Sequence, residues 1–194
     1  MTSYRASDFE LSAASRAFAM LHPKLQRWVY EQGWTTLHDA QERAIEPILA
    51  GDRDVIIAAA TAAGKTEAAL LPICSALAVK QDLEPNSATD NPWTRHDPWA
   101  APTSASASGI GVLYLSPLKA LINDQYDRLE LLCDQADIAV HRWHGDVSAS
   151  AKRAAIGHPS GVLLITPESL EALLVNRGSQ LPTLLAGLSY VVID

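Results

Sequence analysis

Residues 54–66, DVIIAAATAAGKT, decide the fold. An apolar run is followed by small residues and then by Gly64, Lys65 and Thr66. This order predicts a buried strand, a tight turn and the start of a helix, which is the context that a phosphate-binding loop needs. Small residues let backbone N–H groups approach phosphates, and a helix N-terminus favours negative charge. We therefore predict that Lys65 contacts the β- and γ-phosphates of a nucleotide and that Thr66 ligates Mg²⁺.

The loop departs from the strict pattern G-x-x-x-x-G-K-[ST] at its first position, which is Ala59. The alternative interpretation is an ordinary strand-to-helix turn that contains Gly-Lys-Thr. A second signal lies downstream, where the apolar run 190–193 ends in Asp194. Phosphate-loop enzymes hold Mg²⁺ with a carboxylate at the end of such a strand. The order of the two signals along the chain favours a nucleotide site.

Short apolar runs alternate with amphipathic segments through the rest of the chain. The strands that we expect cover 54–58, 111–115, 138–142, 161–165 and 190–193. The helices that we expect begin at Pro23 and cover 39–50, 65–79, 120–132, 148–155 and 168–175. This alternation, with the runs VII, VLYL, VLLI and VVI apolar on both faces, predicts an α/β fold with a parallel sheet and helices on both faces. Residues 81–109, rich in Pro, Ser, Ala and Asp, interrupt the alternation, and we predict a flexible insertion there.

The composition is that of a globular protein, with 48% hydrophobic and 19% charged residues. The formal net charge of −7 weighs against nucleic-acid binding through overall charge but allows a local contact strip. No basic stretch followed by an apolar run opens the chain, and no apolar run approaches the length of about 20 residues that a membrane span needs. We expect a cytoplasmic protein that does not contact a membrane, with Cys74 and Cys133 reduced and buried.

Five short motifs occur in a fixed order from residue 33 onward. They are GWTTLHDAQ at 33–41, AATAAGKTE at 59–67, SPLKAL at 116–121, HGD at 144–146 and TPESL at 166–170. With them the chain resembles superfamily 2 helicases of the DExD/H type, most closely the Lhr-like (large helicase-related) group. In this family the phosphate loop often begins with Ala, whereas Ala62 stands where Gly is usual. The resemblance implies a RecA-like P-loop NTPase domain over 33–194, preceded by a helical extension over 1–32.

The resemblance also implies roles for single residues. Those expected to bind ATP are Gln41, Thr61, Ala62, Ala63, Gly64, Lys65, Thr66 and Glu67. Those expected to ligate Mg²⁺ are Thr66 and Asp194. Those expected to contact the backbone of single-stranded DNA or RNA are Ser116, Pro117, Lys119, Gly145, Asp146, Thr166, Pro167 and Glu168. Hydroxyls, helix N-termini and one lysine suit contacts that position a backbone without reading its bases.

Each of these signals also has a purely structural interpretation. Gln41 alone is more often a solvated helix residue. Ser116 and Thr166, each followed by proline, also fit helix N-caps, and we expect them to serve as caps and contacts together. A metal site at His141, His144 and Asp146 is disfavoured because no fourth ligand lies nearby. The expected environment of Trp143 is core or crevice wall. Lys152 and Arg153 are expected on a solvated helix face, with phosphate contact as the alternative.

The resemblance implies a protein that couples ATP hydrolysis to translocation on, or unwinding of, DNA or RNA. In the family a Glu that orients the attacking water follows the position of Asp194, and a second RecA-like domain supplies arginine fingers. We expect residues 1–194 alone not to turn over ATP, because neither is among them. The alternatives are a catalytically inert fragment that binds nucleotide or nucleic acid, and a P-loop kinase acting on a small molecule. A kinase of this kind would need neither motif 116–121 nor motif 166–170, so the presence of both motifs weighs against it.

Overall fold

The computed structural model describes residues 16–60, 64–83 and 109–194. They belong to two compact units. The first unit comprises Met1–Ala78 and Leu132–Asp137, and the second comprises Val79–Leu131 and Ile138–Asp194. None of the helices within the described ranges is both long and apolar enough to span a lipid bilayer.

The first unit is helical in its described part. It contains the 3-10 turn η1 (Phe18–Met20), the helices α1 (Pro23–Glu31) and α2 (Asp39–Ala50), and the greater part of α3 (Lys65–Leu83). Pro23 occupies the first turn of α1, as predicted, and the apolar stripe of this helix is buried. Helix α2 has the predicted bounds and ends at Gly51, whose φ of 62° is the left-handed conformation that favours glycine.

The two cysteines meet in the core of this unit. Cys74 and Cys133 are both free and fully buried, and their Sγ atoms lie 3.6 Å apart. The contact with the Cys133 sulfur, together with burial, raises the pKa of the Cys74 thiol well above its usual range. The prediction of buried, unbridged cysteines is confirmed, and Cys74 stays a protonated, unreactive thiol near neutral pH.

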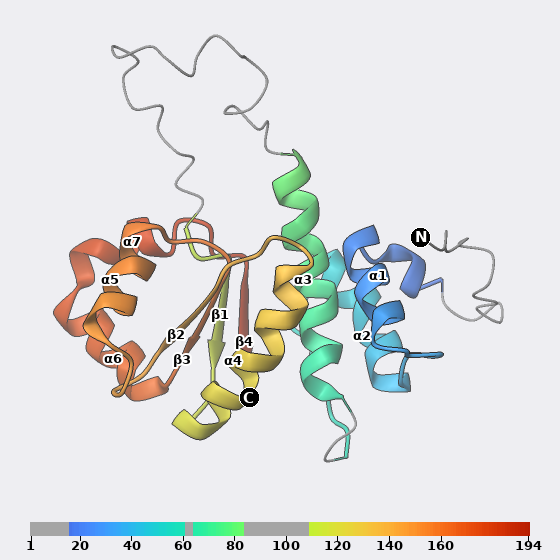
Figure 1. The fold of residues 1–194 in the computed structure, drawn as a ribbon, viewed down its shortest axis with the longest axis horizontal. Coiled ribbons are helices and arrows are strands. Elements are labelled where there is room, and N and C mark those ends of the chain that lie inside the picture. The colour runs from blue at the N-terminus through green and yellow to red at the C-terminus, as the bar shows by residue number, and fades with distance from the viewer. Residues whose placement is uncertain (1–15, 61–63, 84–108) are drawn as a thin grey trace, which may run out of the picture. The chain divides into compact units, whose positions relative to one another are not determined.

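The second unit contains a parallel sheet of four strands. These are β1 (Val112–Leu115), β2 (Val140–Trp143), β3 (Val162–Ile165) and β4 (Tyr190–Ile193). Their order across the sheet is β2-β3-β1-β4, and all three pairings are parallel (Figure 1). The predicted α/β class with a parallel sheet is confirmed. Because all strands run the same way, the loops that follow them meet at one edge of the sheet.

Helices cover both faces of this sheet, as predicted. Helix α4 (Lys119–Asp134) lies on one face, and α5 (Ala149–Gly157), α6 (Pro167–Asn176) and α7 (Leu181–Leu184) lie on the other (Figure 1). The short 3-10 turn η3 (Gly178–Gln180) joins α6 to α7. Successive strand residues point to opposite faces. Leu113, Leu163 and Ile165 therefore pack together into one apolar core with Ala155 of α5 and Leu173 of α6.

Two expectations about secondary structure are wrong. Residues 54–58 form no strand, and the Ile56 side chain is 93% exposed. Helix α3 continues to Leu83, so residues 81–83 belong to a helix and not to the predicted insertion. The rest of that insertion, 84–108, lies outside the described residues, and Gly109 resumes the described chain. Lys, Gln and Leu are good helix formers, which explains the longer helix.

Candidate functional site

The glycine–lysine–threonine sequence lies at the point where α3 begins. Gly64 has a φ of 70°, and Lys65 is the first residue of the helix. The Lys65 ammonium donates hydrogen bonds to the carbonyl oxygens of Ala59 and Ala60, each at 3.0 Å. The lysine at the start of α3 therefore contacts the two described residues that precede 61–63. Thr66 and Glu67 follow in the first helical turn and are half-buried.

Gln41 is in contact with this loop from within the same unit. Its side chain is 1% exposed, and its Oε1 accepts a hydrogen bond from the His38 backbone N–H at 2.9 Å. A Cβ at position 64 would overlap Gln41 Nε2, so the glycine leaves room for the glutamine. The interpretation of Gln41 as a solvated helix residue is therefore wrong. The amide caps α2 and supports the glycine that precedes Lys65.

A pocket of about 850 Å³ opens at the carboxyl edge of the sheet in the second unit. Five of the eight residues predicted to contact nucleic acid line it: Pro117, Lys119, Gly145, Thr166 and Glu168. They come from the loops after β1, β2 and β3 and from the first turns of α4 and α6. Helix N-termini and a lysine facing one cavity provide a favourable environment for a phosphate group.

The two predicted serine and threonine caps differ from each other. Thr166 Oγ1 accepts a hydrogen bond from the Ser169 backbone N–H at 3.3 Å and caps α6, with Pro167 in the first turn. Ser116 is fully buried, and its Oγ has no hydrogen-bond partner among the described residues. The cap prediction is confirmed for Thr166 and wrong for Ser116.

Charges at the pocket are partly neutralised within the protein. The Lys119 ammonium lies 3.1 Å from both carboxylate oxygens of Asp146. Lys152 also lines the pocket, with its Nζ 5.9 Å from the centre of the Trp143 ring. No carboxylate among the described residues is within ion-pair distance of Lys152. Lys152 is thus a cation of this wall that keeps its charge available to a ligand.

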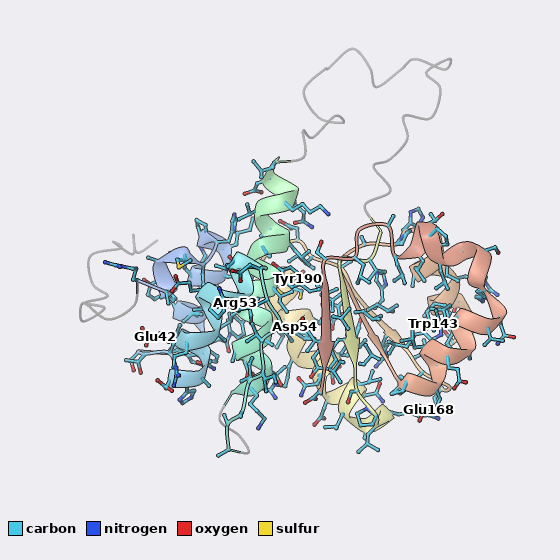
Figure 2. The ribbon with its side chains drawn as sticks, turned by 180° about the vertical axis from the view of Figure 1, so that it is seen from behind. Glu42, Arg53, Asp54, Trp143, Glu168 and Tyr190 are labelled. Atoms are coloured by element: carbon cyan, nitrogen blue, oxygen red, sulfur yellow. The ribbon has the colours of Figure 1, made fainter. Side chains whose placement is uncertain are left out.

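Sequence reasoning raised Lys152 only as an alternative phosphate contact and missed the rest of this part of the wall. Lys152, Asn176 and Arg177 line the pocket, although no motif contains them. Trp143 is 6% exposed and lines it too, so the expectation of a crevice wall is confirmed. Trp143 and Glu168 lie on the side of the sheet that carries α5 and α6 (Figure 2). The missed residues reach the pocket only because α5 and α6 pack on the same face.

His144 packs beneath the pocket and has a structural partner. It is 3% exposed, and its Nε2 lies 3.2 Å from Asn123 Oδ1. Burial lowers the pKa of His144, so the imidazole is neutral at pH 7. No group of three or more His, Cys, Asp or Glu side chains in the described ranges is arranged to hold a metal ion.

Asp194 follows β4 at the same carboxyl edge. Its backbone N–H donates to the Leu115 carbonyl oxygen at 3.0 Å, and its Oδ2 accepts a hydrogen bond from Tyr114 Oη at 2.9 Å. Asp194 belongs to the second unit, whereas Thr66 belongs to the first. The predicted nucleotide residues 61–63 lie outside the described residues.

Comparison with known proteins identifies relatives of the chain. It is 28% identical over 191 residues to the ATP-dependent helicase Lhr-Core of Methanocaldococcus jannaschii, a match that covers 91% of this chain and 20% of the relative. The Lhr-Core helicase of Methanothermobacter thermautotrophicus is 29% identical over 187 residues, a match that covers 91% of this chain and 19% of the relative. The chain thus spans about a fifth of the length of these curated relatives.

Solved structures of helicases share the fold. The helicase MrfA bound to DNA and AMPPNP superposes with a TM-score of 0.69 at 20% identity, covering 90% of this chain and 21% of that one. The Mycobacterium smegmatis helicase Lhr bound to ssDNA and AMP-PNP superposes with a TM-score of 0.62 at 21% identity. This match covers 92% of this chain and 25% of that one. The DEAD/DEAH box helicase family itself matches residues 38–194, which is most of the sequence. The chain therefore belongs to the DEAD/DEAH box helicase family.

Proposed function

We propose that this chain is the ATP-binding lobe of a motor that couples ATP hydrolysis to translocation on, or unwinding of, DNA or RNA. The observation that carries the proposal is the start of α3, where Gly64, at a positive φ, is followed by Lys65 and Thr66 in the first turn of the helix. The relatives are ATP-dependent helicases about five times longer than the matched segment. In this proposal, ATP hydrolysis and movement along DNA or RNA are therefore carried out by a larger protein with a second RecA-like domain.

The nucleotide would be held by the loop and by Gln41. Lys65 would exchange the carbonyls of Ala59 and Ala60 for the β- and γ-phosphates, because an ammonium bonds charged phosphate oxygens more strongly than neutral carbonyls. The Gln41 Oε1 is already used by the His38 N–H, which leaves Nε2 as the group free to meet an adenine acceptor. Glu67 and residues 61–63 would complete the loop around the phosphates.

The donor chemistry of Thr66 and Asp194 fits Mg²⁺. Both provide oxygen atoms, which are the ligands that this hard cation prefers, together with phosphate oxygens. Asp194 Oδ2 accepts one hydrogen bond from Tyr114, and the second carboxylate oxygen has capacity for a metal. Bound Mg²⁺ would neutralise charge on the phosphates. The task of Thr66 and Asp194 is to orient their oxygens toward it.

The pocket at the carboxyl edge would take the backbone of single-stranded DNA or RNA. The first turn of α6 would offer the Glu168 backbone N–H, Thr166 would offer its hydroxyl and Pro167 would shape the turn between them, while Ser116 and Pro117 would shape the loop before α4. Lys119 is paired with Asp146, so these two residues and Gly145 would set the position of the strand more than its affinity. Glu168, which lines the pocket, would contact the strand through its backbone and not through its carboxylate, because a carboxylate repels phosphate.

Replacing Lys152 with alanine should weaken nucleic-acid binding and make it less dependent on salt. Each phosphate contact adds about one unit to the slope of log affinity against log salt concentration, so the slope should fall by about 1. Affinity for a fluorescent oligonucleotide, measured by anisotropy over a series of salt concentrations, gives this slope.

Arg153→Ala is the matched control, because Arg153 is the next residue of the same helix, is exposed and does not line the pocket. Its slope should stay close to that of the wild type. Equal slope changes in the two variants would mean that only overall charge matters and that the pocket is not the binding site.

Nucleic-acid-stimulated hydrolysis tests the whole proposal. The larger protein that contains residues 1–194 should bind ATP, and single-stranded DNA or RNA should raise its rate of ATP hydrolysis, measured as phosphate release. A protein that binds no nucleotide, or that hydrolyses ATP at the same rate with and without nucleic acid, would overturn the motor proposal. A small-molecule kinase would instead transfer the phosphate to a metabolite in the absence of nucleic acid.

A second candidate is binding without turnover by residues 1–194 alone. It is favoured by β4, whose Val191 and Ile193 side chains are 55% and 81% exposed. Among the described strands β4 pairs only with β1. Exposed apolar side chains on an edge strand indicate that the sheet needs further partners to complete its site. ATP turnover by residues 1–194 at the rate of the larger protein would contradict this candidate.

A further inference from the structure

A buried phenol hydroxyl lies against the carboxylate that ends β4. Tyr114, in the middle of β1, is 1% exposed, and its Oη donates a hydrogen bond to Asp194 Oδ2 at 2.9 Å. Strand β1 pairs with β4 in the register Tyr114 with Val192. Because side chains two apart on a strand share a face, Asp194 lies on the same face as Tyr114 and one repeat further along β4.

This contact fixes Asp194 from two sides. The backbone N–H of Asp194 donates to the carbonyl oxygen of Leu115, the residue after Tyr114. Leu115 therefore holds the backbone of Asp194, and Tyr114 holds its carboxylate. With both bonds made, rotation of the carboxylate is restricted and its Oδ1 edge is kept in one direction. An exposed aspartate at a strand end would otherwise sample several rotamers.

The chemistry of β1 argues that the hydroxyl has a purpose beyond packing. The flanking core positions Val112, Leu113, Val162 and Leu164 are aliphatic and buried. A buried hydroxyl is costly in such surroundings unless it is hydrogen-bonded. Phenylalanine would fill the same space without that cost. A tyrosine at this point is therefore best explained by the partner that its hydroxyl reaches.

We propose that Tyr114 is a positioning residue that orients the carboxylate of Asp194 for Mg²⁺. The inference rests on the proposed function, in which Asp194 is a metal ligand. A neutral phenol donates to one carboxylate oxygen and leaves the other for the cation. Partners of this kind orient metal ligands, and their loss commonly weakens metal affinity by about 10–100-fold.

Tyr114→Phe removes one oxygen atom and tests the proposal. The affinity of a non-hydrolysable ATP analogue is measured by calorimetry across a Mg²⁺ series and again in EDTA. The Mg²⁺ concentration at half-effect should rise about 10–100-fold, whereas the affinity in EDTA should not change. An unchanged half-effect concentration would overturn the inference.

Tyr126→Phe is the matched control. The Tyr126 hydroxyl also donates to a carboxylate at 2.9 Å, that of Glu130, but on the surface of α4. Its loss should leave the Mg²⁺ requirement unchanged. If the two variants shift the requirement equally, Tyr114 has no special role. If the wild type binds the analogue with the same affinity in Mg²⁺ and in EDTA, the Mg²⁺ site of the proposed function fails instead.

A second measurement keeps the hydroxyl in place, in case the phenylalanine variant does not fold. 3-Fluorotyrosine inserted only at position 114 reports on the ring by ¹⁹F NMR. Its signal should move when Mg²⁺ is added to the protein with bound analogue, and the signal of the same label at position 126 should not. A stationary signal at position 114 would contradict the proposal.

Discussion

Replacing Lys65 with alanine in the larger protein that contains residues 1–194 is expected to lower the rate of ATP hydrolysis on the order of 10²–10³-fold. Lys65 would place a positive charge on the phosphates where negative charge develops, and removing one such preorganised donor costs a factor of about that size. Hydrogen bonds to the carbonyl oxygens of Ala59 and Ala60 already hold the Lys65 ammonium beside the first residues of the proposed phosphate loop. The rate is measured as phosphate release with saturating nucleic acid.

Lys80→Ala is the control for Lys65→Ala. Lys80 lies in the last turn of the same helix, α3, and is exposed. Its removal changes the charge of the protein equally but should leave hydrolysis within about twofold of the wild type, because exposed charges away from a site contribute little. Melting temperatures of both variants show whether the fold is kept. A Lys65→Ala protein that hydrolyses ATP normally would disprove the phosphate-loop interpretation.

The sheet was predictable because its signals are local. The runs at β1, β3 and β4 are apolar at every position, and those at β1 and β3 are each followed by a segment with helical character. Such runs predict strands covered by helices on both faces. The bounds differ from the prediction by one or two residues at β1, β2 and β3, and agree at β4. The fold class follows from the alternation alone.

The strand at 54–58 was not predictable in the same way. Its apolar residues are as regular as those of β3, yet Ile56 is 93% exposed and no ladder forms. A strand exists only when a neighbour supplies its hydrogen bonds, and that neighbour is distant in sequence. The local pattern reports the preference of the segment and not the presence of a partner. The short α7 was missed because four residues carry no periodicity.

The residues of the candidate site fall into the same two groups, those that a local sequence pattern reveals and those that depend on contacts between distant segments. Its motif residues lie beside strand ends and could be found from sequence, because strand ends mark the ligand edge of a parallel sheet. Arg177 could not be found in this way and Lys152 could be raised only as an alternative, because both reach the pocket through the packing of α5 and α6 on the sheet. The hydrogen bond of Tyr114 with Asp194 joins residues 80 positions apart and depends on strand register.

Register between β2 and β3 depends on Gly161, and Gly161→Ala is expected to destabilise the fold by about 3 kcal/mol or more. Gly161 has a φ of 67°, a conformation that costs an alanine about 1–2 kcal/mol. An added Cβ would also overlap the backbone carbonyl oxygen of Ala139, which accepts the hydrogen bond of the Val162 N–H. Backbone cannot move aside as a flexible side chain can, so this pairing must break.

Gly157→Ala is the comparison that isolates this effect. Gly157 ends α5, and an added Cβ there meets no atom within 4 Å. Alanine is a better helix former, so the change should be neutral or stabilising by up to about 1 kcal/mol. Urea unfolding followed by circular dichroism gives both values, and equal losses would contradict the close approach at Gly161. Because β2 and β3 carry Trp143 and Thr166 to the pocket, the folded fraction of Gly161→Ala should also bind nucleic acid more weakly.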